Sequence, residues 1–350
     1  MVGPLIAHGV ARYRSTGADL PFGDPLRAHG VAMEGYFWRF TDPATGRVVI
    51  ALNGVNRDAS GSTWATLGLA GHPHGHLHTT AHPVGRAAPD GLGAFAGDAF
   101  AGTSSSLRVD LGPRSRLEVD VADPRPWPRR SFGGSSVFQS LPGLNQYWHP
   151  WLLGGKAFGT ASLGSQDWEL DGWDVYAEKN WGKGGFPDSW WWGQAQGFAD
   201  PSVCVAFAGG EVTAAGLSTT VTALVVMLPG GRLVRLGDPV VSGVRARVHD
   251  EHWSLTGRSA QWQIDLEGYG ELGQAHVLPV PLPFERRNIP GAIEHLGATM
   301  RVRVRRWGRL VWSGESTSAA LEHGGIERAQ AEVRRRGHHP HATGAPPHNS

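Results

Sequence analysis

The amino-acid sequence predicts an all-β protein in which two antiparallel β-barrels or sandwiches pack together, with few helices. Short segments with alternating or β-branched residues recur along the chain, and turn-forming residues separate them at intervals typical of all-β folds. The 50 glycines and 24 prolines supply many of these turns. Closed barrels are expected because closure removes the unpaired edges of a sheet.

The expected strands fall into two groups along the chain. The first group comprises residues 35–40, 47–54, 62–71, 106–112 and 116–123. The second group comprises residues 203–209, 219–228, 232–237, 259–269, 298–308 and 309–316. Between the groups, residues 123–134 (DPRPWPRRSFGG) carry three prolines and paired arginines, which are typical of a linker. We therefore predict an N-terminal barrel at 1–125 and a C-terminal barrel at 126–325.

Residues 326–350 have the composition of a disordered tail, with low apolar content and much Pro, Gly and His. The best helical pattern of the chain, Arg328–Arg336, lies in this segment. The three consecutive arginines at 334–336 suit contact with anionic lipid headgroups, at about 1 kcal/mol each near such a surface. A peripheral membrane contact is thus the alternative to a solvated tail, which the composition alone explains.

Bulk composition favours a cytoplasmic protein that does not bind nucleic acid. The formal net charge of +1 gives no long-range attraction for nucleic acid. No run approaches the ~20 apolar residues of a membrane span, and the N-terminus lacks the pattern of a signal peptide. The single cysteine, Cys204, excludes an internal disulfide framework and favours a reducing compartment. Its apolar neighbours predict a buried structural thiol. The oligomeric state is left open.

Residues 145–198 are the most informative part of the chain. Eight of its fifteen tryptophans lie between Trp148 and Trp192. Four potential proton carriers lie among them, namely Asp174, Tyr176, Glu178 and Lys179. A tryptophan buries a large apolar area and must place its N–H, so this cluster predicts a deep aromatic pocket with a few polar groups. Such a pocket suits a large apolar ligand.

Strand alternation divides this region into faces. If residues 173–181 form a strand, one face carries a polar row, namely Asp174, Tyr176, Glu178 and Asn180. Lys179 then lies on the opposite face with Trp181. A second strand would carry rings and amides on one face, namely Trp190, Trp192, Gln194, Gln196 and Phe198. We expect the two strands to form a hairpin around the intervening glycine-rich turn, with these faces side by side.

An acid and several indoles in one pocket would support carbocation chemistry. A carboxylic acid in an apolar wall has a raised pKa, so it stays protonated near neutral pH and can act as a general acid. Indole faces stabilise a cation by about 2 kcal/mol or more when water is excluded. The alternative is a tryptophan-rich barrel core with Glu178 and Lys179 as exposed charges on opposite faces.

Two long segments in this region resemble the sequences of a known protein family. QYWHPWLLGGKAFG (146–159) and YAEKNWGKGGFPDSWWWGQAQGF (176–198) resemble the signature blocks of the tocopherol cyclase family. MEGYFWRF (33–40), which contains Glu34 and Trp38, is similar to the opening that this family shares with lipocalin-like hydratases. SAALEHGG (318–325) resembles the closing block. The resemblance implies a pair of lipocalin-like β-barrels that cyclise a prenylated phenol to a chromanol without metal or organic cofactor.

The resemblance also implies roles for individual residues. Glu178 is the favoured general acid, with Asp174 second, and it protonates the alkene of the substrate. The resulting tertiary cation forms over Trp181, Trp190 and Trp192. The phenol oxygen, positioned by Tyr176, Asn180 or Gln194, then closes the ring. Lys179 completes the catalytic set, while the blocks place Trp148, His149, Glu34 and Trp38 among the substrate-binding residues. Gln196 stands where the family usually has Asn, so it is expected to affect substrate choice.

Two other functions remain open at this stage. The same pocket with water admitted would hydrate the alkene rather than cyclise the substrate. A lipocalin-like protein could also carry an isoprenoid or a quinone without any chemistry. A buried acid with a perturbed pKa beside the ligand separates the enzymes from the carrier. The natural substrate and its prenyl chain length are not fixed by the sequence.

Histidines at every second position are expected to form a surface turn rather than a metal site. GHPHGHLHTTAH (71–82) contains His72, His74, His76 and His78. Same-face neighbours on a strand lie nearly 7 Å apart (about two residues of rise), so adjacent imidazoles share a metal only if the strand bends. Pro73 and Gly75 also disfavour a regular strand here.

Overall fold

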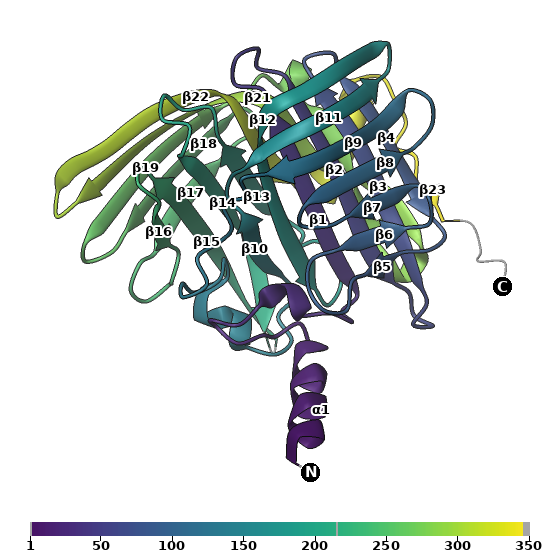
Figure 1. Cartoon of the computed structure of the whole chain (residues 1–350), viewed down its shortest axis with the longest axis horizontal. Coiled ribbons are helices and arrows are strands. Elements are labelled where there is room, and N and C mark those ends of the chain that lie inside the picture. Colours follow the sequence, from purple (N-terminus) through teal and green to yellow (C-terminus); the bar gives the residue numbers. More distant parts are fainter. Residues whose placement is uncertain (1, 215, 346–350) are drawn as a thin grey trace.

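The chain folds into two large curled antiparallel sheets, each formed by strands that follow one another in sequence (Figure 1). The computed structural model describes residues 2–214 and 216–345. The strands of the first sheet are β1 (Met33–Thr41), β2 (Val48–Arg57), β3 (Thr63–His72), β4 (His76–His82), β5 (Arg86–Ala87), β6 (Ala94–Ala96), β7 (Phe100–Gly102), β8 (Ser106–Asp110), β9 (Ser115–Ala122), β10 (Tyr147–Leu152), β11 (Lys156–Leu163) and β12 (Gln166–Gly182).

The strands of the second sheet are β13 (Trp190–Ala195), β14 (Cys204–Ala214), β15 (Leu217–Leu228), β16 (Arg232–Leu236), β17 (Val244–Val248), β18 (His252–Arg258), β19 (Trp262–Tyr269), β20 (His276–Leu282), β21 (Arg287–Arg306), β22 (Arg309–Gly324) and β23 (Thr343–Gly344). Within the described residues, the helices are α1 (Val2–Arg14), α2 (Ile326–Arg335) and the short 3-10 helices η1 (Pro25–Arg27), η2 (Ser136–Ser140), η3 (Leu272–Gln274) and η4 (Pro283–Glu285).

The order of strands shows how each sheet is built. The first sheet runs β4-β3-β2-β1-β12-β11-β9-β8-β7-β6-β5, with β10 also paired to β12. The second runs β16-β15-β14-β13-β22-β21-β19-β18-β17, with β20 and β23 paired to β21. Both sheets are antiparallel and each curls around its own apolar core. The predicted all-β fold with two barrel-like units is therefore confirmed.

Strands between the two cores are buried on both faces. In β2, Val49 and Ala51 belong to the core of the first sheet, whereas Val48 and Ile50 pack in a separate cluster with residues of the second sheet. Successive side chains of a strand point to opposite faces, so a strand covered on both sides needs a continuous apolar run. This explains the sequence VVIAL at 48–52 and shows that the two sheets pack against each other.

One buried arginine links the sheets by hydrogen bonds. Arg39 of β1 is fully buried, and its guanidinium donates to Gln194 Oε1 of the second sheet at 2.9 Å. It also donates to the backbone oxygens of Leu296 (3.1 Å) and Ser318 (2.5 Å) in β21 and β22. A buried charge needs hydrogen-bond partners, and these bonds from the two terminal nitrogens link the sheets, while the Arg39 Nε has no partner within the described residues.

The change from the first sheet to the second lies between Gly182 and Trp190. The predicted linker at 123–134 does follow the last residue of β9. However, β11 returns to pair with β9, and β12 pairs with β1, so the predicted boundary at residue 125 falls inside the first sheet. Proline and glycine in a long excursion give the same local pattern as a linker between units.

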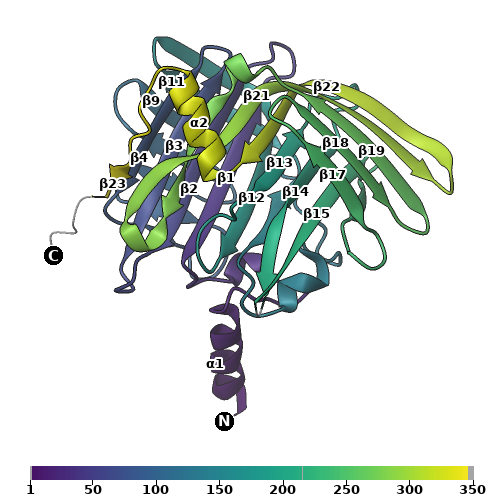
Figure 2. The same cartoon turned by 180° about the vertical axis from the view of Figure 1, so that it is seen from behind.

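The expectation of a disordered tail is wrong for residues 326–345. Residues Ile326–Arg335 form α2, which packs on β21 (Figure 2), and β23 pairs with the start of that strand. Arg335 and Arg336 bind the Glu332 carboxylate at 2.6 Å, as residues three and four apart on a helix can. Arg336 also donates to the Ala275 carbonyl at 2.8 Å. These contacts hold two of the three consecutive arginines on the protein. Residues 346–350 of the expected tail lie outside the described residues.

A transmembrane helix is not found in the described part of the chain, where no helix is long and apolar enough to span a bilayer.

Candidate active site

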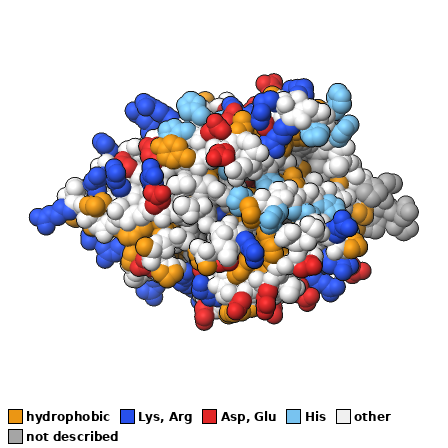
Figure 3. Space-filling model, turned by 90° about the horizontal axis from the view of Figure 1, so that it is seen from above, with side chains coloured by type: hydrophobic (Ala, Val, Ile, Leu, Met, Phe, Trp, Pro, Cys, Tyr) orange, Lys and Arg blue, Asp and Glu red, His pale blue; other side chains and the backbone are white. Residues whose placement is uncertain are grey.

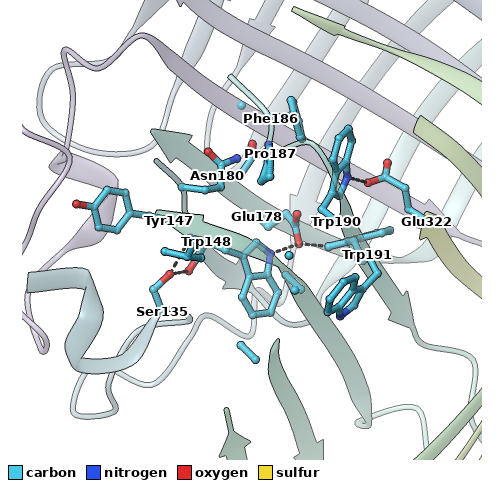
Figure 4. A pocket seen from close by; sticks show the side chains of 18 of the residues that line it. Ser135, Tyr147, Trp148, Glu178, Asn180, Phe186, Pro187, Trp190, Trp191 and Glu322 are labelled. Atoms are coloured by element: carbon cyan, nitrogen blue, oxygen red, sulfur yellow. Dashed lines mark hydrogen bonds between the residues drawn. The ribbon is translucent and has the colours of Figure 1, made fainter. Parts of the chain in front are cut away.

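A cavity of about 420 Å³ lies between the two sheets, within the usual range for small-molecule sites of roughly 300–1,000 Å³. Strands β1, β10 and β12 of the first sheet and β13, β21 and β22 of the second contribute to its wall. Much of the wall is aromatic, including Phe37, Phe138, Trp148, Phe186, Trp190, Trp191 and Trp192. The acidic and amide groups on the wall include Glu294 as well as Glu178, Asn180 and Glu322, which Figure 4 labels.

Strands β12 and β13 both line this cavity and do not form the expected hairpin. β12 pairs with β1, β10 and β11, whereas β13 pairs with β14 and β22. The intervening residues 183–189 cross from one sheet to the other. The glycine-rich connection resembles a hairpin turn locally, but the partner strands are chosen by packing across the whole chain.

Alternation along each strand directs the side chains into the cavity. Glu178 and Asn180 of β12 line it, as do Trp190 and Trp192 of β13. Gly35 lies opposite Asn180 in the neighbouring strand, and a Cβ at position 35 would lie 2.0 Å from the Asn180 Oδ1. Glycine at this position therefore makes room for the amide on the cavity wall.

Glu178 is held by three hydrogen bonds on a single oxygen. The indole N–H groups of Trp148 and Trp192 each donate to its Oε2 at 2.8 Å, and the Tyr176 hydroxyl donates to the same atom at 2.5 Å. Oε1 takes part in none of these bonds. Burial raises the pKa of Glu178 to about 7, although the three donors act in the opposite direction. The carboxyl group is therefore poised to lose or gain a proton near neutral pH.

Two further carboxylates lie on the wall contributed by the second sheet. Glu294 of β21 and Glu322 of β22 are directly opposite each other in the strand pairing. Burial and then the neighbouring Glu322 raise the pKa of Glu294 well above its usual value. Burial also raises the pKa of Glu322 to about 7, and the indole of Trp190 donates to its Oε1 at 2.5 Å.

Sequence reasoning missed both of these acids. Glu322 lies within SAALEHGG, so the family resemblance contained a signal for it. Glu294 is a lone acid in the otherwise apolar stretch GAIEHLG, where a charge inside a buried strand is the available hint. Neither signal reveals that β21 and β22 bring the two acids together, because pairing register depends on the rest of the sheet.

Lys179 and Glu34 form a buried ion pair outside the cavity wall. The Lys179 ammonium lies 3.2 Å from the Glu34 Oε2 and donates to the Ala28 carbonyl at 2.6 Å. His29 and Tyr36 also contact the Glu34 carboxylate, at 2.7 and 3.2 Å. Burial alone would raise the pKa of Glu34, but Lys179 and the hydrogen bonds lower it to about 2. This geometry gives Lys179 and Glu34 a structural position, away from Glu178.

Asp174, the second candidate for the acid, is also outside the cavity wall. Its Oδ1 accepts a hydrogen bond from the Lys156 ammonium at 2.8 Å. In the sheet, Asp174 of β12 lies opposite Thr41 of β1 and Lys156 of β11. The predicted polar row therefore divides in the structure. Glu178 and Asn180 line the cavity and Tyr176 bonds to Glu178, whereas Asp174, further along the strand, is bound to Lys156.

Three aromatic or imidazole groups from the predicted set pack away from the cavity. Trp181 stacks on Tyr147, with centroids 5.4 Å apart, and donates to the Gly17 carbonyl at 2.7 Å. Trp38 belongs to the core of the first sheet. His149 accepts from the Gly134 N–H at 3.2 Å, and burial lowers its pKa to about 3, which keeps the imidazole neutral.

Gln194 and Gln196 belong to the buried polar network around Arg39. Gln194 accepts the bond from Arg39, and its amide donates to Gln196 Oε1 at 3.3 Å. Gln196 in turn donates to the Val175 carbonyl at 3.1 Å. Both amides are buried between the sheets and neither lines the cavity. In this structure the two amides link the sheets, and neither is placed to contact a ligand in the cavity.

The four alternating histidines lie in the hairpin that joins β3 to β4. His74 is exposed in the turn, and His76 and His78 each contact the Ser115 hydroxyl, at 3.1 and 2.9 Å. Histidine side chains gather mainly over the right half of the face shown in Figure 3. Within residues 2–214 and 216–345, no three His, Cys, Asp or Glu side chains are arranged to hold a metal ion.

Comparison with known proteins agrees with this architecture. The tocopherol cyclase-like family model matches residues 127–325. Among solved structures, CghA with Sch210972 is similar, with a TM-score of 0.54, 13% identity, and 85% of this chain and 89% of that chain covered. Kievitone hydratase from Nectria haematococca has a TM-score of 0.50, 12% identity and the same coverage of 85% and 89%.

These structural likenesses concern the fold alone, and no curated protein matches the chain significantly. The family match is stronger evidence, because it spans more than half of the 350 residues and includes the strands that carry Glu178, Glu294 and Glu322. The chain belongs to the tocopherol cyclase-like family.

Proposed function

We propose that the protein closes a prenylated phenol or quinol to a chromanol, with Glu178 as the general acid. The observation that carries this proposal is the position of Glu178, a buried carboxyl group with a pKa of about 7 on the wall of an aromatic cavity. A carrier of apolar ligands has no need to bury an ionisable group in this way, because burial of a carboxylate costs free energy. The family match agrees with cyclase or hydratase chemistry.

The first step is transfer of the Glu178 proton to the less substituted carbon of the prenyl double bond. This transfer leaves a tertiary cation and the Glu178 carboxylate. Trp148 and Trp192 contact the acid and Trp190 lines the same cavity. Phe37 packs edge-on against Trp192 with ring centroids 5.2 Å apart. Their π faces stabilise the cation by about 2 kcal/mol or more in a desolvated site. The three donors on Oε2 stabilise the carboxylate that forms at the same time.

Ring closure follows when the phenol oxygen attacks the tertiary carbon. Asn180 is the amide on the cavity wall next to Glu178 on the same face of β12, so it can orient the phenol. Holding oxygen and cation together in one cavity contributes up to roughly 7–11 kcal/mol in favourable intramolecular reactions. Exclusion of water by the aromatic wall favours cyclisation over hydration. Substrate and product are isomers, so the reaction consumes no redox equivalent.

The cavity opens beside apolar side chains that suit a lipid-like substrate. Leu141 and Leu217 both line the cavity and are 47% and 79% exposed. Helix α1 projects from the same end of the molecule (Figure 1), where the Tyr13 hydroxyl bonds to the Ser140 carbonyl at 2.6 Å. Leu5 and Ile6 of this helix are also exposed. We include in the proposal that this end touches a membrane surface peripherally while the substrate enters.

The proposal is tested by incubating the purified protein with a panel of prenylated hydroquinones that differ in chain length. Equal mass with a shifted retention time identifies cyclisation, whereas a gain of one water identifies hydration. Quenching of tryptophan fluorescence reports binding independently of turnover. Binding without any product, in both wild type and Glu178→Gln, would identify a carrier and contradict the proposal.

A further inference from the structure

The acids Glu294 and Glu322 form a buried pair on the part of the cavity wall that the second sheet contributes. They are direct cross-strand partners in β21 and β22, where Cβ atoms lie about 4.5–5.5 Å apart. Both line the cavity. Glu294 is 1% exposed, and its buried Oε1 has no hydrogen-bond partner in the described parts of the chain. Two carboxylates this close disfavour double ionisation, so the pair retains a proton near neutral pH.

The surroundings of the pair also stabilise one negative charge on it. The Trp190 indole donates to Glu322 Oε1 at 2.5 Å. Gly324 gives this indole its position, since a Cβ there would lie 1.8 Å from the Trp190 Cε2. The buried guanidinium of Arg39 acts on Glu294 in the direction that lowers its pKa, against burial and Glu322, which raise it. The pair is therefore suited to hold one proton and one charge.

Glu178 itself is a poor acceptor for the second proton of the reaction. All three of its donors converge on Oε2, and hydrogen bonds to a carboxylate stabilise the charged form and weaken it as a base. Glu294 has a buried Oε1 that accepts no hydrogen bond within the described residues. The proton donor and the second carboxyl site thus belong to different sheets and line the same cavity.

We propose that the Glu294–Glu322 pair is the general base that removes the phenolic proton during ring closure. This inference rests on the proposed cyclisation. The Glu178 O–H bond breaks as a C–H bond forms on the alkene. The C–O bond of the new ring forms as the phenolic O–H bond breaks, and that proton moves to the singly charged pair. After the product leaves, the pair releases one proton and the Glu178 carboxylate regains one, so no net proton is consumed.

A series of ring-fluorinated prenylated hydroquinones tests this role, because a more acidic phenol needs less help from a base. With the parent substrate, Glu294→Gln and Glu322→Gln are expected to lose about 10²–10⁴-fold in kcat, the usual contribution of general base catalysis. This loss should shrink steadily as the phenol becomes more acidic. The loss in Glu178→Gln should not shrink, since alkene protonation still requires the acid.

The matched control is Glu315→Gln, which removes an exposed acid of β22 that pairs with Arg301 on the protein surface. It should retain wild-type rates across the series. Thermal unfolding and binding of a saturated substrate analogue verify that each variant is folded, and Glu294→Asp replaces Glu294→Gln if the latter does not fold. If Glu294→Gln and Glu322→Gln lose no kcat, or lose the same factor with every substrate of the series, the base assignment is overturned while the proposed cyclisation stands. A wild type that cyclises no substrate overturns the proposed function, and the base assignment with it.

Discussion

Trp192 donates its indole N–H to the Oε2 of Glu178 at 2.8 Å, and this bond joins the two sheets at the acid. Trp192 belongs to β13 of the second sheet and Glu178 to β12 of the first. The same oxygen accepts bonds from Trp148 and Tyr176 on the first sheet. The geometry of the acid therefore depends on correct packing of both sheets, and its protonation depends on the balance between burial and these donors.

Removing the Tyr176 hydroxyl should raise the pH at which activity is lost. Its hydrogen bond lowers the pKa of Glu178, against burial, so Tyr176→Phe should raise that pKa above about 7. The reaction requires protonated Glu178, so the falling limb of the kcat–pH profile should move to higher pH. The profile of the purified variant measures this shift directly.

Tyr269→Phe is the matched control, since this exposed tyrosine stacks on His252 away from the cavity. Its pH profile should superimpose on that of the wild type. An alkaline limb that stays in place, or moves to lower pH, in Tyr176→Phe would show that Glu178 is not the group titrating in that range.

Loss of the Glu34 carboxylate should destabilise the fold and flatten its acid dependence. The folded pKa of about 2 is depressed from roughly 4.3 in the unfolded chain. The stabilisation is therefore complete above pH ~4.3 and is lost as the pH falls toward 2, amounting to about 3 kcal/mol. Glu34→Gln leaves Lys179 buried without its partner, which typically costs 3–5 kcal/mol.

Denaturant unfolding of Glu34→Gln and wild type at pH 7 and at pH 3 measures both effects. The difference in unfolding free energy between the two proteins should narrow at pH 3, where the wild type has lost part of the contribution of Glu34. A difference that stays constant between the two pH values would show that the ion pair does not set the pKa of Glu34.

Gln196→Asn should lower stability without changing the products. The Gln196 amide donates to the Val175 carbonyl at 3.1 Å and does not line the cavity. Shortening the side chain breaks this buried bond, at a cost of about 1–3 kcal/mol. Product analysis with the substrate panel should give the wild-type pattern. A changed preference for chain length would place Gln196 in contact with the ligand, as the sequence led us to expect.

Charge at the mouth of the cavity should impair delivery of substrate from a bilayer. Leu141→Asp and Leu217→Asp replace exposed apolar side chains on the cavity rim. Each variant should turn over substrate in anionic vesicles more slowly, while its rate with detergent-dispersed substrate changes less. Val311→Asp, at an exposed position of β22 that does not line the cavity, is the control. Equal losses in vesicles and in detergent would contradict a membrane contact at this end.

Local patterns predicted the fold class because strand alternation and turns are encoded within a few residues. The continuous run at 48–52 and the aromatic block at 145–198 both lie in strands at or near the interface between the sheets. The boundary at residue 125 could not be predicted in the same way. It depends on β11 returning to β9, a pairing that joins segments beyond the linker to strands before it.

The sequence predicted only those site residues whose position follows from alternation along a single strand. Alternation along β12 placed Glu178 and Asn180 on the face that lines the cavity, and alternation along β13 did the same for Trp190 and Trp192. Gln194 lies on the same face of β13 and Gln196 follows the end of that strand, but both join the Arg39 network and neither lines the cavity. Glu294 joins the site through the register of β21 with β22, which no local pattern reveals.

In the proposed reaction, Glu178 protonates the alkene and the substrate's own oxygen captures the cation. Turnover in D₂O with a prenylated hydroquinone that the wild type accepts tests this claim most directly. We expect a chromanol with one non-exchangeable deuterium, on the ring carbon adjacent to the carbon that bears the new C–O bond, and no product from Glu178→Gln. The control Glu169→Gln, an exposed acid on the same strand, should behave like the wild type. A chromanol without deuterium, or undiminished turnover by Glu178→Gln, would contradict it.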